Sequence, residues 1–207
     1  MSGFEILAIT FSFIIGLGVA QLLSSAALVL REREQVRLHW VPFSMAAIIL
    51  FFQVQFWFAL TVVNSLMDRW SWPVYSTMLL LAITIFLGGA TVLPSSTPTR
   101  DSSLIEDFET RGRISMVFLA LYLVGWIVVG IMFWIPELWH LSLVNGLMAL
   151  ILMVAYAQPK ARVRTALHLS LVAITVYGAL TVWTAPSLQI PWETSAAVTS
   201  LPPAKGE

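Results

Sequence analysis

Long apolar stretches separated by short polar linkers run along the chain. Six of these stretches come near the roughly 20 residues that a helix needs to cross a bilayer core about 30 Å thick. They lie at about residues 5–30, 41–64, 73–93, 112–134, 141–157 and 166–183. The pattern predicts an all-α polytopic membrane bundle, with a six-helix transmembrane domain over residues 1–183 and an irregular, proline-containing tail over 184–207.

The composition supports the membrane interpretation. Of the 207 residues, 58% are hydrophobic and only 11% are charged, against about 25% charged residues in an ordinary soluble domain. A water-soluble fold of this size cannot hide so much apolar surface in one core, so the lipid bilayer is the expected partner. A formal net charge of zero argues against a nucleic-acid partner, which needs a basic surface. The absence of cysteine excludes disulfides and thiolate metal sites.

Basic residues are concentrated in every second linker. The linkers at 31–40, 94–113 and 158–165 hold nine of the eleven Lys and Arg residues. These are Arg31, Arg33, Arg37, Arg100, Arg111, Arg113, Lys160, Arg162 and Arg164. Short loops rich in Lys and Arg stay on the cytoplasmic side, so the three linkers are predicted to be cytoplasmic. With six spans both termini are then outside (N-out, C-out).

Polar residues inside the predicted spans are few and uncharged. No Asp, Glu, Lys or Arg falls at mid-membrane depth, which argues against a carrier that moves protons or sodium through a buried carboxylate. The polar candidates are Gln21, Gln53, Gln55, Asn64 and Asn145. Gln53 and Gln55 point to nearly opposite faces of one helix, so both faces should meet protein. Two interpretations stay open: hydrogen bonds between helices, or a polar path lined by the five amides.

The first span carries small residues at strict four-residue spacing. This ladder consists of Ser12, Gly16, Ala20 and Ser24. Such a ladder lets a second helix approach closely in lipid. The approaching helix belongs either to this chain, or to a second copy in a homo-oligomer, or to a larger membrane complex.

Two of the three histidines are predicted on the same side of the membrane, His39 at the start of the second span and His168 at the start of the sixth. Imidazole is a common metal ligand, so both are candidates for a metal or haem site. Interfacial hydrogen bonding is the favoured interpretation, because no HExxH or HxxxH motif and no acidic partner at ligand spacing accompanies them. The sequence contains no nucleophile elbow, phosphate-binding glycine loop or intramembrane aspartate pair. We therefore predict no catalytic residue and no cofactor.

The longest linker ends in a helix start. Ser103-Leu104-Ile105-Glu106 fits a capping box, in which the serine and glutamate side chains satisfy exposed backbone amides. A helical segment is therefore expected to begin near Leu104, ahead of the fourth span. Leu104 and Phe108 would share one face of it, at the membrane surface.

Two stretches in the first 95 or so residues resemble a known family. Residues 11–23 read FSFIIGLGVAQLL and lead into an arginine-rich loop, and the HW pair at 39–40 opens a span that contains QVQFW at 53–57. In these stretches the chain resembles a family of small, uncharacterised bacterial membrane proteins with six helices. Phe58 stands where a second tryptophan would be typical. The resemblance implies a bacterial inner membrane, and it carries over no functional residue because the family has no assigned activity.

Three functions are compatible with these features. The favoured prediction is a non-catalytic membrane subunit or scaffold, because the chain lacks enzyme motifs and offers its ladder and its two-faced second span to partner helices. The second is a small channel or carrier for a neutral or weakly polar solute, lined by the five amides. The third is an intramembrane cofactor or metal protein that uses His39 and His168.

Overall fold

The computed structural model of the chain describes residues 3–34, 36–65, 70–96, 103–133, 139–159 and 161–184. Each of the six apolar stretches forms a helix, and these described residues contain no strand. The six helices are α1 (Gly3–Arg31), α2 (Trp40–Ser65), α3 (Trp72–Val92), α5 (Ile114–Phe133), α6 (Trp139–Ala157) and α7 (Ala161–Thr184). The fold is therefore all-α, as predicted. From residue 185 onward, the predicted tail lies outside the described residues.

Four of these helices are long and apolar enough to cross a membrane. Their apolar spans are Leu7–Arg31, Trp40–Thr61, Trp72–Val92 and Ile114–Met132. The corresponding stretches of the last two helices are also apolar but shorter, at Ser142–Ala157 and Arg164–Leu180. By length and composition, the structure thus supports four membrane-crossing helices, and the number six stays a prediction.

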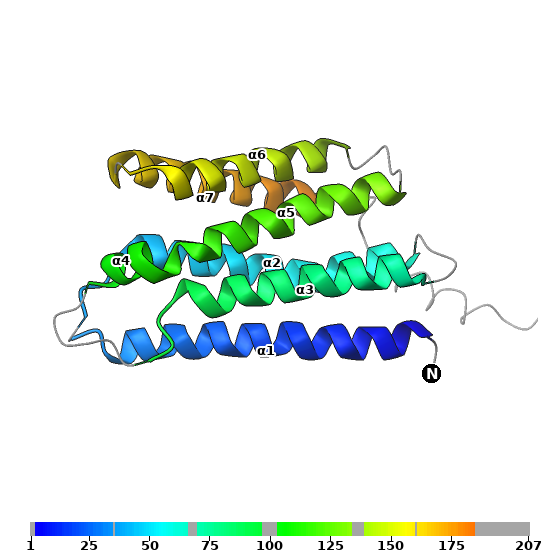
Figure 1. Cartoon of the computed structure of the whole chain (residues 1–207), viewed down its shortest axis with the longest axis horizontal. Helices are drawn as coiled ribbons and strands as arrows, with labels where there is room; N and C mark the ends of the chain where they lie inside the picture. The colour runs from blue at the N-terminus through cyan, green and yellow to red at the C-terminus, as the bar shows by residue number, and fades with distance from the viewer. Residues whose placement is uncertain are drawn as a thin grey trace, which may run out of the picture.

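The long helices lie side by side and alternate in direction (Figure 1). α1 packs against α2 and α3, α3 against α5, α5 against α6, and α6 against α7, which returns to α2. α2 also packs against α3. Because α2 contacts helices from both halves of the chain, it occupies a central place in the bundle.

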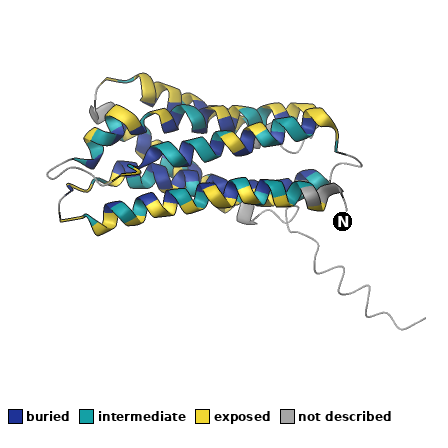
Figure 2. Cartoon of the chain, turned by 60° about the horizontal axis from the view of Figure 1, so that its bottom comes forward, coloured by how far each residue is buried: buried dark blue, intermediate teal, exposed yellow. Residues whose placement is uncertain are grey.

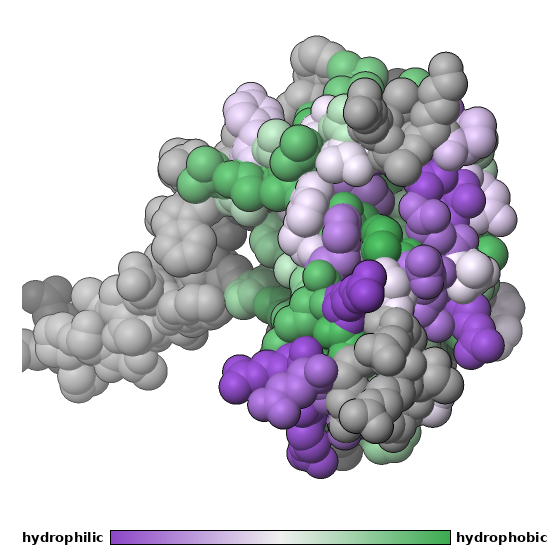
Figure 3. All heavy atoms as spheres, turned by 90° about the vertical axis from the view of Figure 1, so that its left-hand side faces the viewer, coloured by the Kyte–Doolittle hydropathy of each residue, from purple (hydrophilic) through white to green (hydrophobic). Residues whose placement is uncertain are grey.

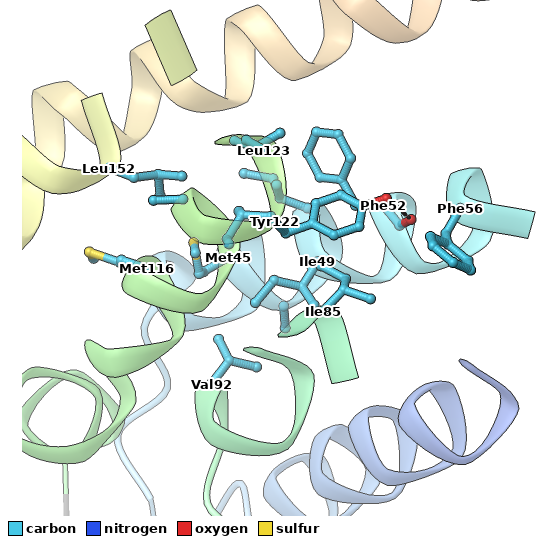
Figure 4. Packing of buried hydrophobic residues seen from close by; sticks show 14 of the residues in the cluster. Met45, Ile49, Phe52, Phe56, Ile85, Val92, Met116, Tyr122, Leu123 and Leu152 are labelled. Carbon is cyan, nitrogen blue, oxygen red and sulfur yellow. Dashed lines mark hydrogen bonds between the residues drawn. The ribbon is translucent and has the colours of Figure 1, made fainter. Parts of the chain in front are cut away.

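Aromatic rings hold the centre of the bundle together (Figure 4). Phe52 of α2 and Tyr122 of α5 meet edge to face, with ring centroids 5.8 Å apart. The Tyr122 hydroxyl donates a hydrogen bond to the Phe52 carbonyl at 3.3 Å. Phe56 meets Phe11 of α1 at 5.9 Å and Trp126 of α5 at 6.2 Å. Edge-to-face contacts of this kind add to the stabilisation from burial alone, and here they connect α1, α2 and α5.

The outer face of the bundle is apolar. Exposed residues follow the outward sides of the helices while buried residues face inward (Figure 2). The exposed positions include large hydrophobic side chains such as Phe13 (73% exposed), Leu80 (64%) and Leu150 (61%). Helices of a water-soluble bundle carry charged and polar residues on this side. The outward apolar surface therefore suits a lipid environment.

A short helical segment precedes α5. It consists of α4 (Leu104–Asp107) and the π-helical turn η1 (Phe108–Gly112). The helix starts at Leu104 as predicted, but Ser103 makes no side-chain capping bond; its carbonyl instead accepts from the amides of Glu106 and Asp107, each at 3.1 Å. The expectation that Leu104 and Phe108 lie at the membrane surface is wrong, because both are buried. The Leu104 amide donates to the Arg37 carbonyl at 3.2 Å, which ties the segment to the linker before α2.

Candidate functional site: a cavity at the basic end of the bundle

The three basic linkers come together at one end of the bundle, the left-hand end in Figure 1. This end gathers the start of α2, the α4–η1 segment and the α6–α7 turn. Figure 3 looks onto this end and shows hydrophilic residues over much of it, with hydrophobic groups between them. The sequence predicts this gathering from the alternation of charged linkers, and the contact between Arg37 and Leu104 links two of them directly.

A cavity of about 100 Å³ opens at this end. Its wall is formed by residues from the start of α2 and the linker before it, from the α4–η1 segment with the start of α5, and from the start of α7. They are His39, Val41, Ile105, Phe108, Glu109, Arg113, Met116, Arg164, Thr165 and His168. The polar members include two arginines, two histidines and one carboxylate. The cavity thus brings together ionisable side chains at this end of the bundle.

Arg164 fixes the side of the cavity formed by α7. Its guanidinium pairs with the Glu109 carboxylate across the gap between η1 and α7. It also donates to the carbonyls of Gln158 at 2.9 Å and Pro159 at 3.2 Å. Arg164 is 9% exposed, and the three acceptors satisfy a buried cation that would otherwise be costly. The same bonds hold the turn between α6 and α7 against the segment before α5.

Arg113 connects the start of α5 to the end of α6. Its guanidinium donates to the Tyr156 carbonyl and lies over the Tyr156 ring, 5.3 Å from the ring centroid. This geometry suits a cation–π contact. Nε of Arg113 is buried and has no hydrogen-bond partner among the residues that the structure describes. One donor of this arginine is therefore left for another acceptor.

His39 and His168, which the sequence places on one side of the membrane, line the same cavity. His39 Nδ1 accepts a hydrogen bond from the Val41 amide at 3.2 Å. His168 is 3% exposed, packs its ring 6.0 Å from the Phe108 ring, and leaves Nδ1 without a partner. Among the described residues, no group of three or more His, Asp or Glu side chains could hold a metal ion. The two histidines share a cavity without forming a ligand set.

The π-helical turn shapes the cavity wall. A π turn holds more residues than an α turn and often occurs at functional sites, and here it places both Phe108 and Glu109 in the wall. Gly112 allows a close approach at this point. A Cβ at Gly112 would lie 2.6 Å from the Phe108 ring and 3.1 Å from the Val92 carbonyl oxygen. A larger residue would therefore displace the Phe108 ring from its place in the wall.

The five amide candidates do not line this cavity. Gln53 is fully buried and donates to the Ile85 carbonyl, and Asn64 accepts a hydrogen bond from Trp70 Nε1 at 3.0 Å. Gln21, Gln55 and Asn145 are half-buried. The partners of Gln53 and Asn64 favour the first interpretation of these residues, hydrogen bonds that join helices and linkers.

The small-residue ladder of α1 faces outward. Gly16, Ala20 and Ser24 are exposed, and a Cβ at Gly16 would meet no atom within 4 Å. Ser12 is half-buried and donates to the Ala8 carbonyl of its own helix at 2.6 Å. The buried seam of α1 lies on the opposite side and consists of Phe11, Ile15, Gly18, Leu22, Ser25 and Val29. Packing among the described residues therefore does not account for the ladder.

Sequence reasoning missed Glu109, Arg113 and Arg164 as site residues. The two arginines were used only as markers of the cytoplasmic side. Their position next to the predicted span ends that carry His39 and His168 was the available signal. Glu109 gave no signal, because nothing local distinguishes it from Glu106 or Asp107.

Comparisons with known protein families, with curated proteins and with solved structures gave no match. No family is assigned to the chain. The resemblance to small bacterial membrane proteins stays a prediction.

Proposed function

We propose that the chain is a membrane protein with six transmembrane helices and both termini outside, and that it acts as a non-catalytic subunit that associates through the outward face of α1. The four long apolar helices support membrane insertion. The shorter apolar stretches of α6 and α7 complete the six crossings, because these helices pack alongside the others. The basic linkers at one end support the orientation.

The outward position of the ladder carries this proposal. Small residues at four-residue spacing let helices approach closely in lipid, where no hydrophobic force drives association. In α1 they lie opposite the seam that packs against α2 and α3. α1 is also the least covered of the four long spans, with 28% of it buried against 39–44% of the others. The helix with the largest free face thus carries the ladder on that face.

The partner that we propose for this face is α1 of a second copy. A twofold axis places the same patch on both subunits, and the ladder of each α1 would then admit the backbone of the other at Gly16 and Ala20. The exposed side chains of Phe13, Leu17 and Leu23 flank the ladder and would pack around the crossing point.

Disulfide cross-linking in the membrane tests this arrangement directly. The chain has no cysteine, so Ala20→Cys introduces a single thiol on the ladder. Disulfides form only when the two Cα atoms come within about 7 Å. We expect mild oxidation to yield covalent dimers of Ala20→Cys, and much less dimer for the matched controls Leu80→Cys and Leu150→Cys, which are exposed on α3 and α6. Equal yields at the three positions would reject the proposal.

A blocking variant completes the test. Gly16→Leu adds bulk where no atom of the described residues lies within 4 Å of the added Cβ, so the monomer should fold normally. Native mass spectrometry from mild detergent should then give monomer for Gly16→Leu and dimer for the wild type. A wild-type chain that is monomeric, or that carries only a different protein, would reject the second copy as partner.

A further inference from the structure

Two side chains in the wall of the cavity at the basic end each carry a nitrogen that is left unsatisfied. Arg113 and His168 both line the cavity, and Nε of the first and Nδ1 of the second are buried with no hydrogen-bond partner among the described residues. Buried polar groups in folded proteins almost always have a hydrogen-bond partner. We propose that this cavity binds a phosphate group, carried either by a lipid headgroup or by a soluble phosphate compound.

The charges in the wall favour an anion over a cation. Two arginines face a single carboxylate, Glu109, and that carboxylate already pairs with Arg164. A guanidinium has donors only, so Nε of Arg113 requires an acceptor. His168 Nδ1 donates to an oxyanion when it carries the ring proton, and His39 lies in the same wall. A metal ion would be repelled by the excess positive charge, and the wall offers few free ligands to bind it.

The size of the cavity suits a compact oxyanion. One water molecule takes about 30 Å³ in the liquid, so a cavity of about 100 Å³ has room for a tetrahedral group of a few heavy atoms. A phosphate offers several acceptor oxygens, and hydrogen bonds from arginine to phosphate are among the strong ones in proteins. A single phosphate can therefore satisfy Arg113 and His168 together.

The surroundings of the cavity fit a headgroup at the membrane surface. Val41, Ile105 and Met116 give the wall an apolar part next to its charges. Nearby, Trp40 and Ile114 are 41% and 38% exposed, as expected where a bundle meets the interface between lipid and water. Basic pockets between helices on the cytoplasmic side commonly bind phospholipid headgroups. A soluble phosphate has the same recognition chemistry, so the experiment must separate the two sources.

Thermal unfolding of the full chain in a mild non-ionic detergent provides the readout. One arm titrates inorganic phosphate against sodium chloride at matched ionic strength. The other arm titrates a short-chain phosphatidic acid against the diacylglycerol with the same acyl chains. We expect a saturable rise in Tm that the matched control lacks. A rise with the lipid alone identifies a headgroup site, and a rise with inorganic phosphate identifies a site that also takes soluble phosphate.

Three variants test whether the rise in Tm comes from binding in the cavity. Arg113→Gln removes the unsatisfied donor, and we expect the affinity to fall about tenfold or more, the scale of one hydrogen bond to a charged group. Ile105→Phe keeps every charge and fills part of the cavity, so it should weaken binding even if Arg113→Gln folds poorly. Arg33→Gln removes an exposed arginine from the same end and should bind like the wild type.

Three outcomes would overturn the proposal. They are no saturable response in either arm, wild-type affinity in both Arg113→Gln and Ile105→Phe, and an equal loss in Arg33→Gln, which would indicate surface charge only. The inference does not depend on α1 association. The cavity variants should leave the oligomeric state unchanged, and the Gly16→Leu variant should leave phosphate binding unchanged.

Discussion

The side-chain amide of Gln53 on α2 donates from Nε2 to the backbone carbonyl of Ile85 on α3, 3.4 Å away. Gln53 is completely buried, and two glycines make the room for its amide. A Cβ on Gly18 of α1 would lie 2.8 Å from Nε2, and a Cβ on Gly89 of α3 would lie 2.7 Å from it. One polar side chain thus occupies the point where three helices meet.

Alanine at either glycine should destabilise the protein. The Gln53 amide cannot move away from one new Cβ without approaching the other helix, so we expect Gly18→Ala and Gly89→Ala each to lower the free energy of unfolding by about 1–3 kcal/mol. Thermal unfolding in mild detergent measures the change. Gly178→Ala on α7, outside the proposed α1 contact, is the control: no described atom lies within 4 Å of its Cβ, so stability should hold or rise, since alanine favours helix by about 1 kcal/mol over glycine. Equal effects at the three positions would contradict the crowding argument.

Two substitutions of Gln53 distinguish what its size contributes to stability from what its hydrogen bond contributes. Hydrogen bonds between membrane helices average only about 0.6 kcal/mol, and Oε1 of Gln53 has no partner to lose. We therefore expect Gln53→Met, which keeps the length of the side chain, to change the free energy of unfolding by less than about 1 kcal/mol. Gln53→Ala should cost about 2 kcal/mol or more, because it leaves a cavity between three helices. If methionine proves as harmful as alanine in the unfolding assay, the hydrogen bond dominates and this argument is wrong.

The helices could be predicted from the sequence. Which face of α1 packs against the bundle and which face points outward could not. Apolar length and charged linkers place the helices without any knowledge of tertiary structure. In α1, however, the buried seam with Gly18 and Leu22 and the outward ladder with Gly16 and Ala20 are both apolar or small. A helix that is apolar all round has no polar side to mark its outer face. Only the packing against α2 and α3 decides which face is free.

The candidate site was predictable in part. The alternation of basic linkers along the sequence predicts that His39 and His168 lie on the same side of the membrane. In the structure both line one cavity. The pairing of Glu109 with Arg164 could not be foreseen, because it joins residues 55 positions apart across helices whose neighbours depend on the whole bundle. The π-helical turn that carries Glu109 likewise has no local signature in the sequence.

The Arg164–Glu109 pair should contribute measurably to stability. The Arg164 side chain is 11% exposed but that of Glu109 is 37% exposed. Because water screens the exposed carboxylate, we expect Glu109→Gln to lower the free energy of unfolding by only about 1 kcal/mol. Arg164→Gln should cost more, because it also abandons the carbonyls of Gln158 and Pro159. In a double-mutant cycle, the two losses should combine to less than their sum by about 0.5 kcal/mol or more. The exposed Arg111→Gln is the matched control and should change stability little; a fully additive cycle would mean that the pair contributes nothing.

The orientation and the number of crossings can be measured with single cysteines, since the chain has none of its own. In right-side-out vesicles, a membrane-impermeant maleimide should label Ser71→Cys, which is exposed at the end opposite the basic linkers. Arg33→Cys and Ser96→Cys should react only after permeabilisation, because short basic loops stay on the cytoplasmic side.

Ala157→Cys, exposed at the end of α6, distinguishes six crossings from four. If α6 and α7 cross the bilayer, Ala157→Cys is protected like Ser96→Cys; if only the four longest helices cross, it is labelled from outside like Ser71→Cys. Labelling of Ser96→Cys in sealed vesicles would reverse the orientation and move the phosphate cavity to the outer leaflet.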